Sequence, residues 1–289
     1  MWTIAKLSCR EVLSKRIFLI TILMTLAFLL FYGVATHYGS REFAEELQQR
    51  GGSGGVQMER AFVSTQLLGV GLYFASFITA LLSILACVGA VSGEIESHQI
   101  DTILARPLRR RDVIFGKYLG FGGLLVIYAL GLFAGILLIN QTLGGVLQLS
   151  LHLSQIVGAA ALFAMQPLVL VAAALWLSSR MTTINGGVIL IILYGIGFIG
   201  GFVEQLGVLL NNNALVNSGI VTSLIFPLDS LFRKMTLTLF DAPSDPFSFA
   251  AQGLFGSLSA PSGLMIGYAL LYGAVMLLLA FRQFAKRDL

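Results

Sequence analysis

The sequence has 289 residues, of which 57% are hydrophobic and only 11% are charged. Soluble domains carry roughly 25% charged residues, so this chain has too few charges to cover the surface of a water-soluble fold. The mean hydropathy of +0.88 therefore indicates a lipid-facing surface. The formal net charge of +4 comes from short basic clusters beside apolar segments, a pattern typical of membrane topology, and it argues against nucleic acid as a partner.

Six apolar windows are long enough to cross the hydrocarbon core of a membrane, which takes about 20 residues for a helix. They cover residues 17–36, 67–91, 118–140, 153–177, 186–206 and 264–284. Backbone groups inside a bilayer must be satisfied within their own segment, and helices achieve this. We therefore predict an all-α integral membrane protein with six transmembrane helices in a single transmembrane domain over residues 1–289.

Lysine and arginine residues are distributed unevenly among the connections. Thirteen lie on the side of the N-terminus: Lys6, Arg10, Lys15, Arg16, Arg106, Arg109, Arg110, Arg111, Lys117, Arg180, Arg282, Lys286 and Arg287. Five lie on the other side: Arg41, Arg50, Arg60, Arg233 and Lys234. Basic residues near the ends of spans resist translocation, so we expect both termini in the cytosol and a multi-pass protein of the cell membrane, inner or plasma.

Residues 1–16 precede the first window and combine apolar and basic side chains. The apolar ones recur at helical spacing: Trp2, Ala5, Cys9, Val12 and Leu13. Lys6 and Arg10 line another face. This pattern predicts an N-terminal interfacial helix in contact with membrane lipid. The alternative is a basic tail that only sets the topology.

Two connections on the side opposite the N-terminus differ in character. Residues 37–65 contain the run Gly51-Gly52-Ser53-Gly54-Gly55, which favours a solvated, mobile loop. Residues 207–263 are apolar for a connection, and Pro227 interrupts their helical spacing. We expect an outer re-entrant or interfacial segment here, with one or two outer-leaflet helices before the last span.

A seventh full span within residues 207–263 is disfavoured by its charges. Asp229, Arg233 and Lys234 would lie inside it, and each costs about 2.5 to 3.5 kcal/mol near the bilayer centre. Such a span would also place the basic C-terminus on the outer side.

The connection between the second and third windows, residues 92–117, carries nine formal charges from Glu94 to Lys117. Several of its residues are nevertheless apolar: Ile95, Ile100, Ile103, Leu104 and Leu108. They predict a short amphipathic helix that ends near Pro107 and contacts a protein partner or the membrane surface.

This connection resembles the first cytosolic loop of permeases of type-2 ATP-binding-cassette (ABC) exporters. The matching elements are Gly93-Glu94, Thr102-Ile103-Leu104, Arg106-Pro107, Arg109 to Arg111 and Gly116-Lys117. His98-Gln99 stands where small residues are common in that family. Residues 225–233 show a weaker similarity to the permease that helps mature the copper site of nitrous-oxide reductase.

The resemblance implies that residues 92–117 are a cytosolic coupling loop whose helix seats in a groove of a separate ABC ATPase subunit. The residues implied in partner binding are Glu94, Glu96, His98, Asp101, Thr102, Leu104, Arg106 and Pro107. A second copy of the permease would complete a homodimer. ATP and Mg would be bound by the ATPase subunit, with no cofactor in this chain.

Other motifs carry no catalytic chemistry. The chain lacks a phosphate-binding loop, since Gly116-Lys117 is followed by Tyr118, and we predict that it is not an enzyme. The pattern Gly195-Ile196-Gly197-Phe198-Ile199-Gly200 lies inside a window, where small residues predict close helix packing. His37, His98 and His152 have no paired spacing, so no metal site is expected.

Glu204 is the only acidic residue within the six windows, near the outer end of the fifth. It is either part of a gating or substrate path or a solvated helix end. Two other functions stay open: an ion-gradient-driven transporter or channel subunit, and a non-transporting membrane anchor or sensor for an ATPase. The first is less favoured because no window has an ionisable group near its centre. The apolar walls favour a lipid-like, peptide or drug-like cargo over a small ion.

Overall fold

The computed structural model describes residues 2–50, 54–97, 110–240 and 261–286. Across these residues the chain is helical and has no β-strand. The helices are α1 (Trp2–Ser14), α2 (Arg16–Arg50), α3 (Gly54–Cys87), α4 (Ser92–Glu96), α6 (Arg110–Leu143), α7 (Leu153–Arg180), α8 (Thr183–Leu209), α9 (Asn213–Ile225), α10 (Leu228–Phe240) and α12 (Leu264–Lys286). A short 3-10 turn, η1 (Gly145–Leu147), follows α6.

Six of these helices are long and apolar enough to cross a membrane, which confirms the predicted class of all-α integral membrane protein. They are α2, α3, α6, α7, α8 and α12. Large apolar side chains remain exposed on them, for example Leu30 at 72% and Ile127 at 74%. In water such exposure would be costly, whereas in a bilayer these side chains meet acyl chains.

The prediction of a mobile loop over residues 37–65 is wrong for the part that the structure describes. α2 continues to Arg50 and α3 starts at Gly54. The 35 residues of α2 span about 52 Å at 1.5 Å per residue, well beyond a hydrocarbon core of about 30 Å. Residues 42–49 are mostly good helix formers, and Phe43 is buried, so propensity and packing extend the helix up to the glycine run.

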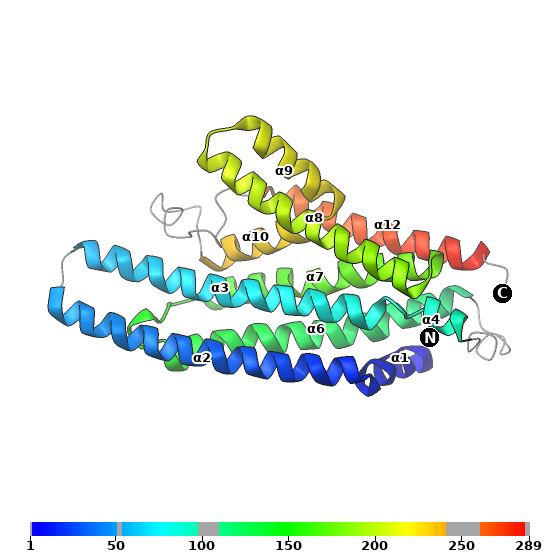
Figure 1. Cartoon of the computed structure of the whole chain (residues 1–289), viewed down its shortest axis with the longest axis horizontal. Coiled ribbons are helices and arrows are strands. Elements are labelled where there is room, and N and C mark those ends of the chain that lie inside the picture. Colours follow the sequence, from blue (N-terminus) through cyan, green and yellow to red (C-terminus); the bar gives the residue numbers. More distant parts are fainter. Residues whose placement is uncertain (1, 51–53, 98–109, 241–260, 287–289) are drawn as a thin grey trace.

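Both termini and α4 lie at one end of the bundle, here called the α4 end (Figure 1). The end of α2 and the start of α3 lie at the other, here called the hairpin end (Figure 1). α1 packs along the start of α6 at the α4 end, and it buries Ala5, Ser8 and Val12. A Cβ added at Gly120 would come within 2.5 Å of the Ala5 carbonyl oxygen, so glycine permits this close approach.

α1 therefore turns only part of its apolar side toward the protein. Trp2 and Leu13 are exposed, and these two side chains are free to contact lipid at the membrane surface.

The connection between α8 and α12 contains two helices, α9 and α10, that meet at an angle of 106°. If this bent pair were counted as one span, the protein would have seven. α9 folds back along α8, whereas α10 packs mainly on α7. The predicted segment 207–263 thus has two helices in its described part, while residues 241–260 lie outside the described residues.

Candidate functional site

The start of the predicted coupling loop is held by a buried serine. α4 follows α3 after a turn of four residues, and its first backbone groups face the end of α7. The Ser178 hydroxyl oxygen accepts the N–H groups of Val91 and Ser92, at 3.0 and 2.9 Å. Ser178 is fully buried, and the Ser92 hydroxyl lies 3.1 Å from it. Because the donors are backbone groups, this contact fixes the path of the chain into α4.

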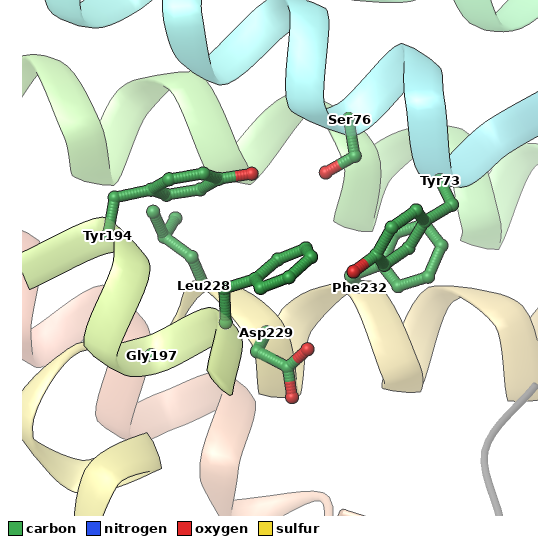
Figure 2. Close-up of a pocket in the computed structure, with 8 residues that line it drawn as sticks. Tyr73, Ser76, Tyr194, Gly197, Leu228, Asp229 and Phe232 are labelled. Carbon is green, nitrogen blue, oxygen red and sulfur yellow. The ribbon is translucent and has the colours of Figure 1, made fainter. Parts of the chain in front are cut away.

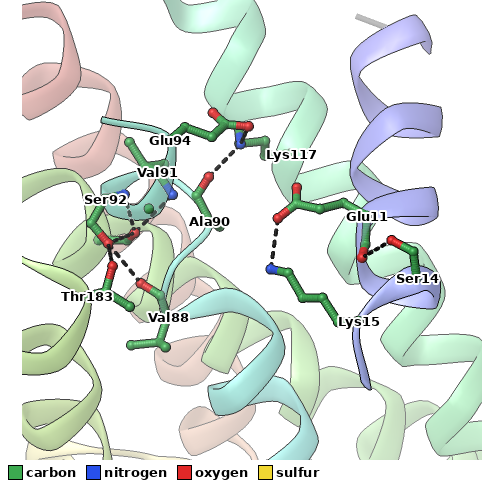
Figure 3. Close-up of polar contacts among 12 residues, drawn as sticks. Glu11, Ser14, Lys15, Val88, Ala90, Val91, Ser92, Glu94, Lys117 and Thr183 are labelled. Atoms are coloured by element: carbon green, nitrogen blue, oxygen red, sulfur yellow. Dashed lines mark hydrogen bonds and ion pairs between the residues drawn. The ribbon is translucent and has the colours of Figure 1, made fainter. Parts of the chain in front are cut away.

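Glu94 ties α4 to α6 through an ion pair (Figure 3). Its carboxylate lies 2.6 Å from the ammonium of Lys117, whose side chain is only 2% exposed. Lys117 also donates to the carbonyl oxygen of Ala90, in the turn before α4. The predicted motif residues Glu94 and Lys117 are thus brought together, and Lys117 serves a carboxylate rather than a phosphate. Removing one partner of such a buried pair typically costs about 3 to 5 kcal/mol.

Glu96 ties α4 to the first turn of α8. One carboxylate oxygen accepts the backbone N–H of Thr183 at 2.9 Å, and the other accepts the Thr183 hydroxyl at 3.1 Å. The residue before α8, Thr182, gives no side-chain cap of its own. Glu96 therefore supplies, from another helix, the negative charge and the acceptor that a helix N-terminus favours.

The rest of the predicted partner-binding set lies outside the described residues: His98, Asp101, Thr102, Leu104, Arg106 and Pro107. Their roles stay predictions. For Glu94 and Glu96, the structure adds what they contact within the chain, namely α6 and α8. Ser178 and Thr183 complete this α4 site, and the motif gave no signal for them because they lie about 85 residues downstream.

A second polar site lies near the hairpin end of α8, where Glu204 is 4% exposed. The reading of Glu204 as a solvated helix end is therefore wrong. Its carboxylate lies 2.7 Å from Arg233 of α10, and Asp229 lies 2.8 Å from the same guanidinium. The Ser223 hydroxyl also lies within hydrogen-bonding distance of Arg233. This buried triad of Glu204, Asp229 and Arg233 explains how the charges are accommodated in an apolar segment: two carboxylates share one guanidinium.

A small pocket borders the triad between α3, α8 and α10 (Figure 2). Its lining is mainly aromatic and includes one carboxylate: Tyr73, Ser76, Tyr194, Gly197, Phe198, Leu228, Asp229 and Phe232. At the edge of the pocket, the Ser76 hydroxyl donates a hydrogen bond to the side-chain amide oxygen of Gln166 on α7, at 2.6 Å. The hollow has a volume of about 20 Å³, which is room for about one water molecule. Among the described residues, no group of three or more His, Cys, Asp or Glu side chains is placed to hold a metal ion.

The whole chain can be compared with known families. A family model described as ABC-2 family transporter protein matches residues 2–289. The chain belongs to the ABC-2 transporter family. A search of curated proteins found no match to it.

Membership gives this ABC-2 transporter protein a general role as the membrane subunit of an ABC transporter, which works with an ATPase partner. It agrees with the resemblance seen in residues 92–117. The weaker similarity to the permease of nitrous-oxide reductase maturation stays a prediction, because the family match is broader than that group.

Proposed function

We propose that this ABC-2 subunit is an exporter permease that forms a homodimer in the cell membrane and moves its cargo with energy from a separate ATPase subunit. The ATPase subunit binds ATP and Mg, and residues 92–117 dock into it at the cytosolic face. The α4 end is then cytosolic, in agreement with the thirteen basic residues on that side.

The observation that carries this proposal is the attachment of α4 to three different spans. Ser178 anchors it to α7, Lys117 to α6 and Thr183 to α8. A loop that only connected two helices would need no such ties. A loop that transmits force needs them, because a movement of its tip reaches the spans only if its base is rigid.

The cargo is proposed from the apolar spans, because Glu204, the only acidic residue in the six predicted windows, is paired within the protein. The pocket beside the triad is too small to hold a molecule of this kind. We therefore favour a lipid-like, peptide or drug-like cargo.

The buried triad also bears on the alternative of a gradient-driven transporter. Such proteins use ionisable groups near the bilayer midplane, whereas Glu204 is five residues from the end of α8 and is paired. The exporter permease therefore remains the better-supported function.

The test is purification in mild detergent with the ATPase subunit expressed from the same cell. We expect recovery of the two subunits in equal numbers, and ATP-dependent movement of a fluorescent lipid across reconstituted vesicles. Glu94→Gln should retain the ATPase subunit and its hydrolysis but lower transport per ATP. Arg10→Gln, which changes an exposed basic residue of α1 at the same end but outside residues 92–117, is the control. Recovery of the permease without any ATPase would refute the proposal, and hydrolysis without transport would favour the anchor or sensor.

A further inference from the structure

We infer that α8 and α9 form one arm that carries the movement of the coupling loop to the hairpin end, and that Glu96 and Glu204 are the positioning residues that set its tilt. This inference rests on the proposed function and adds the route of the signal. Figure 1 shows α8 and α9 side by side and inclined away from the helices of the main bundle.

The two helices of the arm are interlocked through glycine. A Cβ at Gly207 of α8 would lie 2.6 Å from the Val216 amide nitrogen of α9. A Cβ at Gly219 of α9 would press on the backbone of Glu204. Backbones this close move together, because no flexible side chain lies between them to absorb a displacement.

One aliphatic face of α8 makes little contact with the main bundle. Ile184, Val188, Ile192 and Ile199 are all at least half exposed. Among the buried residues of α8, only Leu190 is a large apolar side chain. In lipid such apolar faces gain little from packing. The middle of α8 contacts α3 through aromatic rings, Tyr194 with Phe77 and Phe198 with Tyr73, at 6.2 and 5.4 Å between ring centroids.

Polar contacts fix the arm at its two ends. At the α4 end, the Glu96 carboxylate accepts hydrogen bonds from the backbone N–H and the hydroxyl of Thr183. At the hairpin end, Glu204 holds Arg233, which belongs to α10 and therefore to the part packed on α7. The two contacts are separated by 21 residues of helix, about 32 Å at 1.5 Å per residue. A shift of α4 therefore tilts a rigid rod whose far end presses on the buried triad.

Glu96 is suited to this task because it is exposed and belongs to the residues implied in binding the ATPase subunit. A docked subunit can thus displace it directly. Coupling is reciprocal, so a ligand that moves the hairpin end also changes the state of the loop.

The test follows a reporter at the far end of the arm. Leu210, next to the end of α8, is 68% exposed, and Leu210→Cys is introduced after Cys9 and Cys87 are replaced. The complex with its ATPase subunit is placed in lipid nanodiscs, and the rate of labelling by a membrane-impermeant maleimide is measured without nucleotide and after trapping with Mg·ATP and vanadate. We expect trapping to change the rate several-fold in the otherwise unaltered protein.

Glu96→Ala should reduce this nucleotide effect roughly fivefold, as for the loss of a strong helix cap. The amount of ATPase subunit recovered with each variant is measured as well, so that weaker docking is distinguished from weaker transmission. Glu96→Gln, which keeps the acceptor but loses the charge, should be intermediate, and Thr183→Ala is a milder variant of the same contact. Glu42→Ala, an exposed acid at the hairpin end, is the control.

Each outcome bears on a different claim. An unchanged nucleotide effect in Glu96→Ala, or no effect in the parent complex despite hydrolysis, overturns the inference. Failure to recover any ATPase subunit overturns the proposed function instead.

Discussion

Lys117 offers the sharpest test of the α4 site, because it is a buried charge whose polar partners, within the described part of the chain, are Glu94 of α4 and the Ala90 carbonyl just before it. The change Lys117→Met keeps the length of the side chain and removes the ammonium. It leaves the Glu94 carboxylate facing a methyl group, and the Ala90 carbonyl loses a donor. Breaking a buried ion pair costs about 3 to 5 kcal/mol, and the 13% exposure of the Glu94 side chain places this case near the lower value.

A loss of about 3 kcal/mol corresponds to a fall in melting temperature of roughly 6 °C, since large chains shift by about 2 °C per kcal/mol. The assay is thermal aggregation of the detergent-solubilised protein, followed by size-exclusion chromatography. The double variant Glu94→Gln with Lys117→Met removes both charges and should recover about half of the loss or more. Arg111→Met, an exposed basic residue on the same helix, should change the melting temperature little. Equal stability of Lys117→Met and the parent would refute the reasoning.

Three further predictions concern the other close contacts. Gly120→Val should push α1 off α6, so that maleimide labelling of half-buried Cys9 becomes several-fold faster; an unchanged rate would contradict the packing seen here. Arg233→Met leaves two carboxylates buried without a cation. It should lower the melting temperature by roughly 6 to 10 °C in total, compared with roughly 6 °C for Lys117→Met. Gly207→Val should separate α9 from α8 and destabilise the protein in the same assay, whereas Gly195→Ala, which meets open space, should be tolerated.

The spans and the fold class could be predicted from sequence because the bilayer imposes one strong condition, about 20 apolar residues per helix. The same reasoning failed between the first two spans. There the glycine run drew attention to flexibility, but it occupies only five positions, and the residues before it favour a helix on their own.

Glu204 was misread for a different reason. Its partner, Arg233, lies 29 positions downstream. The sequence argument treats Arg233 only as a cost of placing residues 207–263 in lipid. Sequence gives the charge of each residue but not which charges meet. The spacing of Asp229 and Arg233, one helical turn apart, was the available signal for an ion pair.

The glycine pattern in the fifth window was interpreted correctly as a packing surface, yet only some of its members serve it. Gly197 and Gly200 face Phe226 and Thr222, whereas Gly195 meets open space. Small residues mark a helix that is able to approach another closely, and the direction of approach depends on the fold.

The ionic character of the two ends of α8 has a physical reason. Inside a bilayer, apolar contact between helices is hardly better than contact with acyl chains, so a surface of isoleucine and glycine does not define one orientation. Directional contacts define the orientation of a helix, because a carboxylate accepts hydrogen bonds only over a narrow range of distance and angle. Glu96 and Glu204 thus add a directional contact near each end of α8 to the aromatic packing of Tyr194 and Phe198 on α3 between them. A helix held in this way has few defined positions, and one polar contact can change without disrupting a packed core. The movement that we infer for α8 requires a contact of this kind.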